Sequence, residues 1–412
     1  MEPPSPSGVA AEGADLLSSL PAALLDEILT RLDLRDAVRT SALSRAWRRR
    51  WESVAGLALC FPEGTPPGAV DRVLFQYTCP DVSRFAFDAD DGSVSHVDHW
   101  LIALSRRRSV ESIAIRWDVG TSDPDDFALH SSIFSCAGLV SLRLHWCSIP
   151  PLPVGFAGFP VLEELYLGNV LFSDYGQLQA IVRGSPLLRV LSLEDGHDYA
   201  DMIAAPNLHS LTLHSEYDSD WRFGELPCLQ DAYICAQSCL LLRYDFGRFF
   251  AGFAQVRKLT FFSPVTEVNI STTPFTFYNL KSLELSTHFV HMSTIFLMFC
   301  LLRSSPNLEK LKIQTEGSET IANWEFLNTQ WTDGMCANLQ IVEIISFRQW
   351  LPISLLKLIL SKASLLRTLS VDACPQSQDD PLNELLKCRK TSAQAQVLFK
   401  FLSRPLVVYA VL

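Results

Sequence analysis

From residue 54 onward, the apolar residues recur in one short pattern, apolar-x-x-apolar-x-apolar. The clearest copies begin at Leu139, Leu162, Leu188, Leu208, Leu280 and Leu308, and weaker copies begin at Val54, Val82, Val110, Leu229, Val256, Leu339 and Leu366. All 39 positions of these thirteen copies are apolar, although only 48% of the chain is hydrophobic. The copies begin 20 to 31 residues apart, so the pattern predicts one structural unit that is repeated along most of the chain.

Proline supports the same phase, because five prolines lie two residues before the first apolar position of a copy. They are Pro160, Pro186, Pro206, Pro227 and Pro306. Proline ends the preceding segment and starts an extended one, since it cannot continue a helix. The spacing matches leucine-rich repeats, whose short strands stack into a solenoid. We therefore expect an α/β fold with inward apolar positions, parallel strands on the concave face, and helices and loops on the convex face.

The apolar segments between the strands are expected to be convex-side helices, most clearly at residues 295–302 and 353–360. Leucine-rich repeats usually carry asparagine or cysteine three residues after the last apolar position. Here only Cys147 and Cys374 stand at that position. Without an asparagine ladder, we expect the loop hydrogen bonds to differ between turns and the curvature to be irregular.

A helical pattern precedes the repeats. The first predicted helix has Pro21 in its first turn and carries one apolar stripe, formed by Leu24, Leu25, Ile28, Leu29 and Leu32. A second helix is predicted over residues 34–43 and a third over 44–54, which contains Trp47 and Trp51. A unit of about 40 residues rarely holds a core alone. It must dock on the rest of the chain or on another protein, and the pattern alone leaves both open.

The motif of this helical unit reads LP, LLDEIL and LDLRDAVRTSALSRAWR over residues 20–48. It resembles the F-box of plant F-box/leucine-rich-repeat proteins, with one departure at Asp33, where many relatives carry proline. The resemblance implies docking onto the Skp-family linker subunit of an SCF-type (Skp–cullin–F-box) ubiquitin ligase, and through it onto the cullin/RING ligase. The contacts that it implies are Leu20, Pro21, Leu24, Ile28, Leu29 and Val38.

A second resemblance lies near the C-terminus. Residues 336–372 read CANLQIVEIISFRQWLPISLLKLILSKASLLRTLSVD, a strand, a turn, an amphipathic helix and a second strand. They resemble the FBD region that closes many plant F-box/leucine-rich-repeat proteins. The expected organisation is a disordered segment (1–17), an F-box (18–54), degenerate leucine-rich repeats (55–335), FBD-like terminal repeats (336–374) and a tail (375–412). The apolar end at 405–412 is either a last strand or a poorly packed extension.

The charge balance limits the kinds of partner that the chain is expected to bind. The chain has 34 basic and 45 acidic residues, a net charge of -11, which argues against a nucleic-acid or anionic membrane partner. The basic run at Arg45 and Arg48–Arg50 does not change this, because residues 1–56 hold 7 basic and 8 acidic groups. Eleven cysteines without regular spacing fit a reducing compartment. With no signal peptide or membrane-length apolar run, we expect a cytoplasmic and/or nuclear protein.

Side chains that could carry chemistry form no recognisable motif. Cys235 with Cys239 and His288 with His291 lack a second pair at zinc-site spacing, so no metal or cofactor is expected. His96 and His99 lie in an acidic segment that reads best as a solvated face. No nucleophile elbow, phosphate loop or zinc-protease motif is present, and a non-catalytic protein with no catalytic residues is expected.

The concave strand face is the expected target-binding surface. Its candidate residues are Arg84, Arg116, Arg143, Tyr166, Tyr233, Lys258, Phe262, Lys310 and Lys312. Seven acidic residues share that face, namely Asp88, Glu164, Glu194, Asp231, Glu284, Glu343 and Asp372. Six basic groups against seven acidic ones do not make a polyanion groove, whereas arginine with aromatic residues is typical of protein interfaces.

These observations lead to one main hypothesis: a substrate-recognition adaptor whose F-box attaches to an SCF scaffold and whose repeats hold a target protein. One alternative is an F-box scaffold that does not serve a ligase. Another is a repeat receptor that senses a small ligand. A crevice into which Arg143 and Tyr166 converge would favour this alternative.

Overall fold

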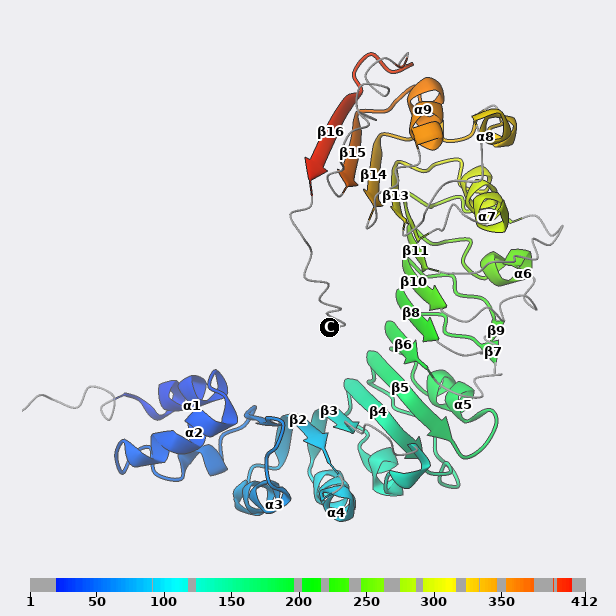
Figure 1. The fold of residues 1–412 in the computed structure, drawn as a ribbon. Coiled ribbons are helices and arrows are strands. Elements are labelled where there is room, and N and C mark those ends of the chain that lie inside the picture. The colour runs from blue at the N-terminus through cyan, green and yellow to red at the C-terminus, as the bar shows by residue number, and fades with distance from the viewer. Residues whose placement is uncertain are drawn as a thin grey trace, which may run out of the picture.

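Parallel strands run side by side along the inner side of an arc, and helices cover its outer side (Figure 1). This computed structural model describes residues 20–90, 92–117, 124–195, 202–215, 222–236, 246–262, 275–286, 292–315, 324–332, 334–346, 353–373, 388 and 391–401. The segment 1–17, the apolar end at 405–412 and Cys374 lie outside the described residues, as do Cys239, His288 and His291.

Within the described residues, fourteen strands form one sheet whose order follows the chain. They are β1 (Ala58–Phe61), β2 (Asp81–Ala89), β3 (Ser109–Trp117), β4 (Ser141–Ile149), β5 (Glu164–Phe172), β6 (Val190–Glu194), β8 (Ser210–Ser215), β10 (Asp231–Ala236), β11 (Lys258–Phe262), β12 (Ser282–Ser286), β13 (Lys310–Thr315), β14 (Ile341–Ser346), β15 (Thr368–Ala373) and β16 (Gln396–Phe401). β7 (Met202–Ile203) and β9 (Arg222–Phe223) form a separate pair. All neighbours are parallel, which confirms the predicted α/β solenoid.

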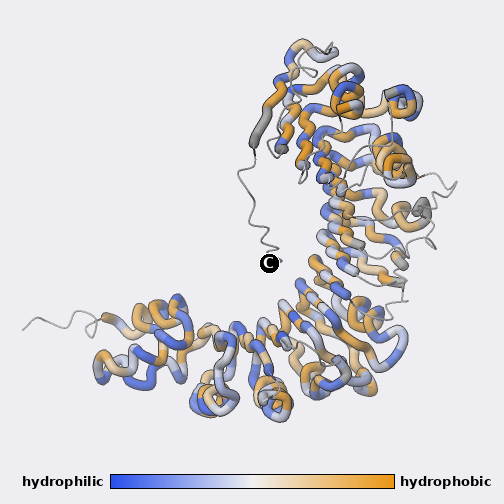
Figure 2. The backbone as a smooth tube through the Cα atoms, in the orientation of Figure 1, coloured by the Kyte–Doolittle hydropathy of each residue, from blue (hydrophilic) through white to orange (hydrophobic). Residues whose placement is uncertain are grey.

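The repeated apolar positions form the core of this solenoid. None of the 39 residues has more than 4% of its surface exposed. Equivalent positions lie side by side in the sheet, as in the series Leu142, Leu165 and Leu191. Each repeat therefore covers the apolar edge of the next, and the core is a line rather than a ball. Figure 2 shows the result as hydrophobic and hydrophilic positions that alternate along the whole arc.

The register corrects the predicted pattern at both ends. Leu59 pairs with Phe85, so the first repeat lies two residues later than the copy that begins at Val54. At the other end, β16 adds a fourteenth repeat, in which Val397 pairs with Leu369. The pattern missed this repeat because a polar residue, Gln394, stands at its first position.

Helices and short 3₁₀ turns cover the convex side (Figure 1). They are α3 (Pro67–Gln76), α4 (Val94–Ser105), η3 (Pro124–Asp126), η4 (Ser131–Ser135), α5 (Gln177–Arg183), α6 (Phe246–Ala251), α7 (Met292–Arg303), α8 (Trp324–Gln330) and α9 (Ile353–Lys362). α7 and α9 contain the apolar segments 295–302 and 353–360, as predicted. None of the helices in the described ranges is long and apolar enough to span a membrane.

Asparagines bridge successive repeats at a position that the sequence pattern did not single out. The Asn207 amide donates to the Pro186 carbonyl at 2.7 Å, and Asn307 donates to Tyr278 at 2.9 Å. A third, Asn338, donates to the Pro306 carbonyl at 3.2 Å. All three stand directly before the first apolar position of a repeat. They give part of the solenoid an asparagine ladder that lies before the strand and not after it.

The N-terminal module consists of α1 (Ala22–Thr30), α2 (Leu34–Arg39), η1 (Thr40–Ala42) and η2 (Arg50–Glu52). The helix predicted over 44–54 is wrong, because turns and the short η2 occupy this segment. Arg49 adopts a left-handed backbone with φ of 60°, which an α-helix cannot contain. The tryptophans of this segment are nevertheless buried, so the apolar pattern was correct although the helix was not.

Candidate protein-binding surfaces

The N-terminal module is built onto the first repeat and shares its core. The buried Trp51 belongs to the same apolar cluster as the strands. The Tyr77 hydroxyl, at the end of α3, donates to the Val54 carbonyl at 2.7 Å, and the Thr78 N–H donates to the Glu52 carbonyl at 2.6 Å. These contacts join the module to the solenoid as one body. The module therefore caps the sheet, and only its outer side is free for another protein.

The structure divides the predicted linker contacts into exposed and buried residues. Pro21 is exposed and Leu24 has 45% of its surface exposed, which is unusual for a leucine on an apolar stripe. Three others are half-buried, namely Leu20, Ile28 and Val38. Leu29 has 0% exposure, so its side chain offers no surface to a partner and instead holds α1 in the core. The remaining five stay predicted contacts.

Leu43, which follows η1, is a second exposed leucine of the module, and the sequence pattern did not select it. It has 57% of its surface exposed. The sequence held a hint of this exposure, because Leu43 does not continue the apolar stripe of a predicted helix. Asp33, the departure from the F-box motif, has a local role. Its carboxylate accepts the Asp36 N–H at 2.8 Å and caps α2, which a proline could not do.

Two of the four arginines of the run, Arg49 and Arg50, make hydrogen bonds within the module. Arg50 donates to the Asp26 carboxylate at 2.6 Å and to the Ala22 carbonyl at 2.8 Å, and it thereby fastens η2 to α1. Arg49 donates to Glu52 at 2.8 Å. Arg45 and Arg48 are exposed. The run thus supports the module, consistent with its being a solvated face.

The concave face carries the predicted mixture of charges, and most of its cations are already paired. The ion pairs are Arg116–Asp88 at 3.1 Å, Arg143–Glu164 at 3.1 Å, Lys310–Glu343 at 2.8 Å and Lys312–Glu284 at 2.5 Å. Each joins neighbouring strands. Exposed pairs of this kind contribute about 0–1 kcal/mol to stability, so their main effect is to neutralise the surface. Arg84 and Lys258 form no ion pair within the described part of the chain.

Arg143 and Tyr166 lie close together, as the small-ligand hypothesis requires, but their side chains contact each other. The Arg143 guanidinium lies 3.7 Å from the centre of the Tyr166 ring, a close cation–π contact. Glu164 accepts from the same guanidinium and from the Ser141 hydroxyl, both at 3.1 Å. The planar face and the charge of Arg143 are therefore already engaged.

A second aromatic pair lies further along the face. Tyr233 on β10 and Phe262 on β11 are packed edge to face with ring centres 5.6 Å apart. Tyr233 has 37% of its surface exposed, and partial burial raises the pKa of its phenol to about 12. The ring is therefore neutral at physiological pH and offers an apolar, hydrogen-bonding anchor of the kind that is enriched at protein interfaces.

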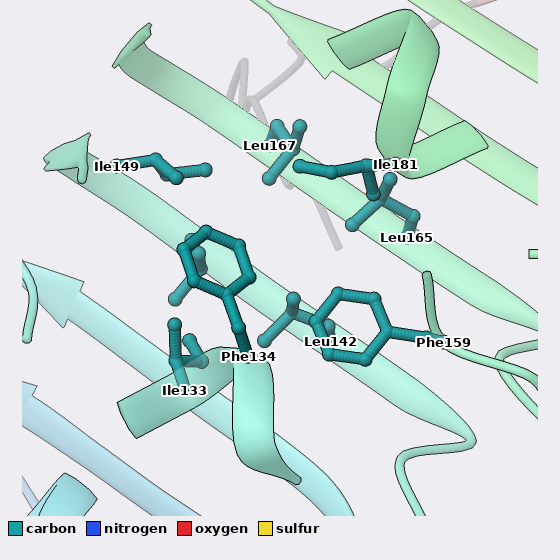
Figure 3. Close-up of a pocket in the computed structure, with 9 residues that line it drawn as sticks. Ile133, Phe134, Leu142, Ile149, Phe159, Leu165, Leu167 and Ile181 are labelled. Atoms are coloured by element: carbon teal, nitrogen blue, oxygen red, sulfur yellow. The ribbon is translucent and has the colours of Figure 1, made fainter. Parts of the chain in front are cut away.

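Two buried thiols and one apolar void are candidate sites for chemistry in the described part of the solenoid. Burial raises the pKa of the Cys136 thiol to about 11 and that of Cys336 to about 12, so neither is a thiolate at neutral pH. No group of three His, Cys, Asp or Glu residues in the described ranges could hold a metal ion. A void between η4, β4, β5 and α5 is lined by nine apolar residues, among them Phe134, Phe159 and Ile181 (Figure 3). It offers no polar group for chemistry.

Fourteen parallel strands on a concave face, convex helices and an N-terminal helical cap define a leucine-rich-repeat solenoid with a helical module at its end. A family model described as "FBD-associated F-box protein At5g56370, LRR repeats" matches residues 97–313, and an F-box domain model matches residues 17–56. The chain belongs to this family of FBD-associated F-box proteins with leucine-rich repeats.

Similar proteins of Arabidopsis thaliana carry the F-box and the leucine-rich repeat in their names. The F-box/FBD/LRR-repeat protein At1g13570 is 26% identical over 94% of this chain and 99% of its own length. The F-box/LRR-repeat protein At5g02910 is 28% identical over 77% of this chain and 75% of its own length. The likeness to the first of these spans nearly the whole chain, from the F-box to the terminal repeats.

Proposed function

We propose that the protein is a non-catalytic substrate adaptor of an SCF-type ubiquitin ligase in the cytoplasm and/or nucleus. Its F-box docks on a Skp-family linker subunit, and its repeats hold a target protein near the cullin and RING subunits. The observation that carries the proposal is the exposure of Leu24 and Leu43 on a module whose other side is packed into the solenoid. The adaptor contributes proximity, because it raises the local concentration of the target beside the catalytic subunits.

Co-purification with the linker subunit tests this proposal. Leu24→Asp with Ile28→Asp places one charge at an exposed and one at a half-buried position of α1 and should abolish co-purification. Leu365→Asp is the matched control, because Leu365 is 52% exposed and lies near the far end of the solenoid. Circular dichroism should show that both variants stay folded. Retention of the linker by the double variant would contradict the docking surface.

Reconstitution with cullin separates the ligase adaptor from a scaffold without ligase activity. If the complex transfers ubiquitin to a bound target, the adaptor role is supported. If the linker binds but cullin is never recruited, the scaffold is the better description. A small-ligand receptor would require a ligand that raises the melting temperature of the full chain, and the engaged state of Arg143 argues against one at that residue.

A further inference from the structure

One row of side chains follows the edge of the sheet where the strands begin. We call it the rim row and define it as the residue directly after the first apolar position of each repeat from the copy at Val110 to the copy at Leu366. Its members are Glu111, Val140, Glu163, Arg189, His209, Gln230, Arg257, Lys281, Glu309, Gln340 and Arg367. The N–H of each member donates to the carbonyl of the member before it, as in Arg257 to Gln230 and Lys281 to Arg257, both at 2.8 Å. The row is therefore a continuous ladder.

The middle of the rim row is basic and is bounded by acids. From Arg189 to Lys281 no member of the row is acidic, whereas Glu163 precedes this stretch and Glu309 follows it. Lys258 stands next to Arg257 on the concave side. We refer to Arg189, His209, Arg257, Lys258 and Lys281 as the basic strip.

Three of the five members of the basic strip are unengaged, whereas the Nδ1 atom of His209 lies 2.7 Å from the Asn207 carbonyl oxygen. Arg189, Arg257 and Lys258 are exposed, and none of the three has an ion pair or a side-chain hydrogen bond with another residue of the described part of the chain. Lys281 pairs with Glu309 at 2.6 Å, which closes the strip at that end. A further acid, Asp231, stands opposite Lys258 on the neighbouring strand.

This concentration of free cations stands out in a chain of net charge -11. Four of the six basic residues of the concave face are neutralised by neighbouring carboxylates, as described above. Arg84 and Arg367 are also unpaired, but each stands alone: Arg84 lies between Ala58 and Ser112, and Arg367 follows Gln340 in the rim row. Unpaired arginines in a row are suited to carboxylates, which they bind in a bidentate manner.

We propose that the basic strip binds a short, extended, acidic segment of the target protein, a proposal that rests on the adaptor function. Neighbouring strands are about 4.8 Å apart, so the four steps from Arg189 to Lys281 span roughly 19 Å. An extended peptide advances about 3.3 Å per residue, so about six residues fill this length. Since alternate side chains face the same way, such a segment presents up to three carboxylates to the strip.

The surroundings favour a peptide over a nucleic acid. Glu163 and Glu309 limit the length of the cationic stretch, and the acidic balance of the whole chain repels a long polyanion. The exposed Tyr233 and the half-buried Phe262 lie further along β10 and β11, the strands that follow Gln230 and Arg257 of the rim row, and can take an apolar residue of the same target. An acidic peptide with an apolar residue meets both features.

Fluorescence anisotropy with the full chain tests the proposal. The probe is a fluorescein-labelled hexapeptide of alternating glutamate and serine, and the control probe carries glutamine in place of glutamate. Arg189→Glu with Arg257→Glu should weaken binding of the glutamate probe by at least about tenfold, because two cations become repulsive. Arg84→Glu with Arg367→Glu is the matched control, with the same charge change outside the strip, and should bind as the wild type does.

Three results would overturn the proposal. They are equal binding of the glutamate and glutamine probes, equal loss in both double variants, and tighter binding of a labelled six-nucleotide oligothymidylate than of the glutamate probe. Linker co-purification of the same variants keeps the two proposals separate. If the wild-type chain retains the linker but does not bind the glutamate probe, only the basic strip is contradicted, and loss of the linker by Leu24→Asp with Ile28→Asp should leave probe binding unchanged.

Discussion

A close backbone approach between two glycines of the solenoid predicts a measurable effect of one methyl group. Gly184 ends α5 and lies against Gly158 in the segment that precedes β5. A Cβ added to Gly184 would lie 2.6 Å from the Ala157 carbonyl oxygen and 2.9 Å from the Gly158 nitrogen, and closer still to the Gly158 Cα. Contacts under 3.0 Å are essentially never seen for a real Cβ. Both segments must therefore move apart in the variant Gly184→Ala.

The magnitude follows from two opposing effects. Overpacking a well-packed contact costs about 1–3 kcal/mol. Gly184 has φ of -77°, which alanine adopts without strain, so the lower entropy of the unfolded chain returns about 0.4–1 kcal/mol. We expect a net loss of about 1–2 kcal/mol. Gly68→Ala is the control, because Gly68 lies in α3 with nothing within 4 Å of the added Cβ, and it should gain about 0.4–1 kcal/mol.

Urea unfolding followed by circular dichroism measures both variants. The midpoint should fall for Gly184→Ala and rise slightly for Gly68→Ala, so the same chemical change has opposite signs at the two sites. Equal midpoints for the two variants would refute the reasoning, because the steric contact at Gly184 would then contribute nothing. The void of Figure 3 lies beside this contact, with Phe159 and Ile181 in its lining. If the void absorbed the shift of the two segments, the loss at Gly184 would fall below 1 kcal/mol.

Three further predictions concern the ladder, a thiol and the F-box. Asn307→Asp cannot donate to the neighbouring repeat and should lower the unfolding free energy by about 1 kcal/mol; an unchanged urea midpoint would show that the ladder is not stabilising. Burial raises the pKa of Cys136 from 9.0 to about 11, so its contribution to stability is full below pH 9 and is lost as the pH rises through 11. At pH 8, mass spectrometry should find iodoacetamide on the exposed Cys228 and not on Cys136. Leu29→Ala should cost about 2–5 kcal/mol, whereas Leu24→Ala should change the urea midpoint little; comparable losses would contradict the division between core and surface.

The inward positions of the solenoid could be predicted because buried positions are occupied by apolar residue types. An apolar residue at each template position is selected by equivalent neighbours in each repeat, so the pattern recurs wherever both neighbouring repeats are present. The two errors fall at the ends of the sheet, where that condition fails. At the N-terminal end the F-box supplies part of the cover, and Val54 is buried without belonging to the sheet register. At the C-terminal end, Gln394 replaces an apolar residue in the last repeat.

Backbone conformation and contacts between distant repeats could not be predicted in this way, because they do not select a residue type. Arg49 and Trp146 have left-handed backbones, although arginine and tryptophan are not residue types that favour a positive φ. The break of the predicted third helix at Arg49 therefore had no signal in the sequence. Leu29 and Leu24 share one helical stripe, and only the packing of the module on the first repeat shows which of them is covered. The basic strip was missed for a similar reason, because Arg189 and Arg257 lie 68 residues apart in the sequence and only the rim-row ladder brings them within three strand steps of each other.

The shared core of the F-box and the first repeat bears on how an adaptor would work. If the module were joined by a flexible linker, the target would sample many positions relative to the ligase, and the gain from proximity would be diluted over that volume. Here Trp51 lies in the same apolar cluster as the strands, and the hydrogen bonds of Tyr77 and Thr78 cross the junction. Packing would therefore fix the position of the concave face relative to a docked linker. The basic strip lies in the middle of the arc, so a segment bound there would be held at a set distance from the module.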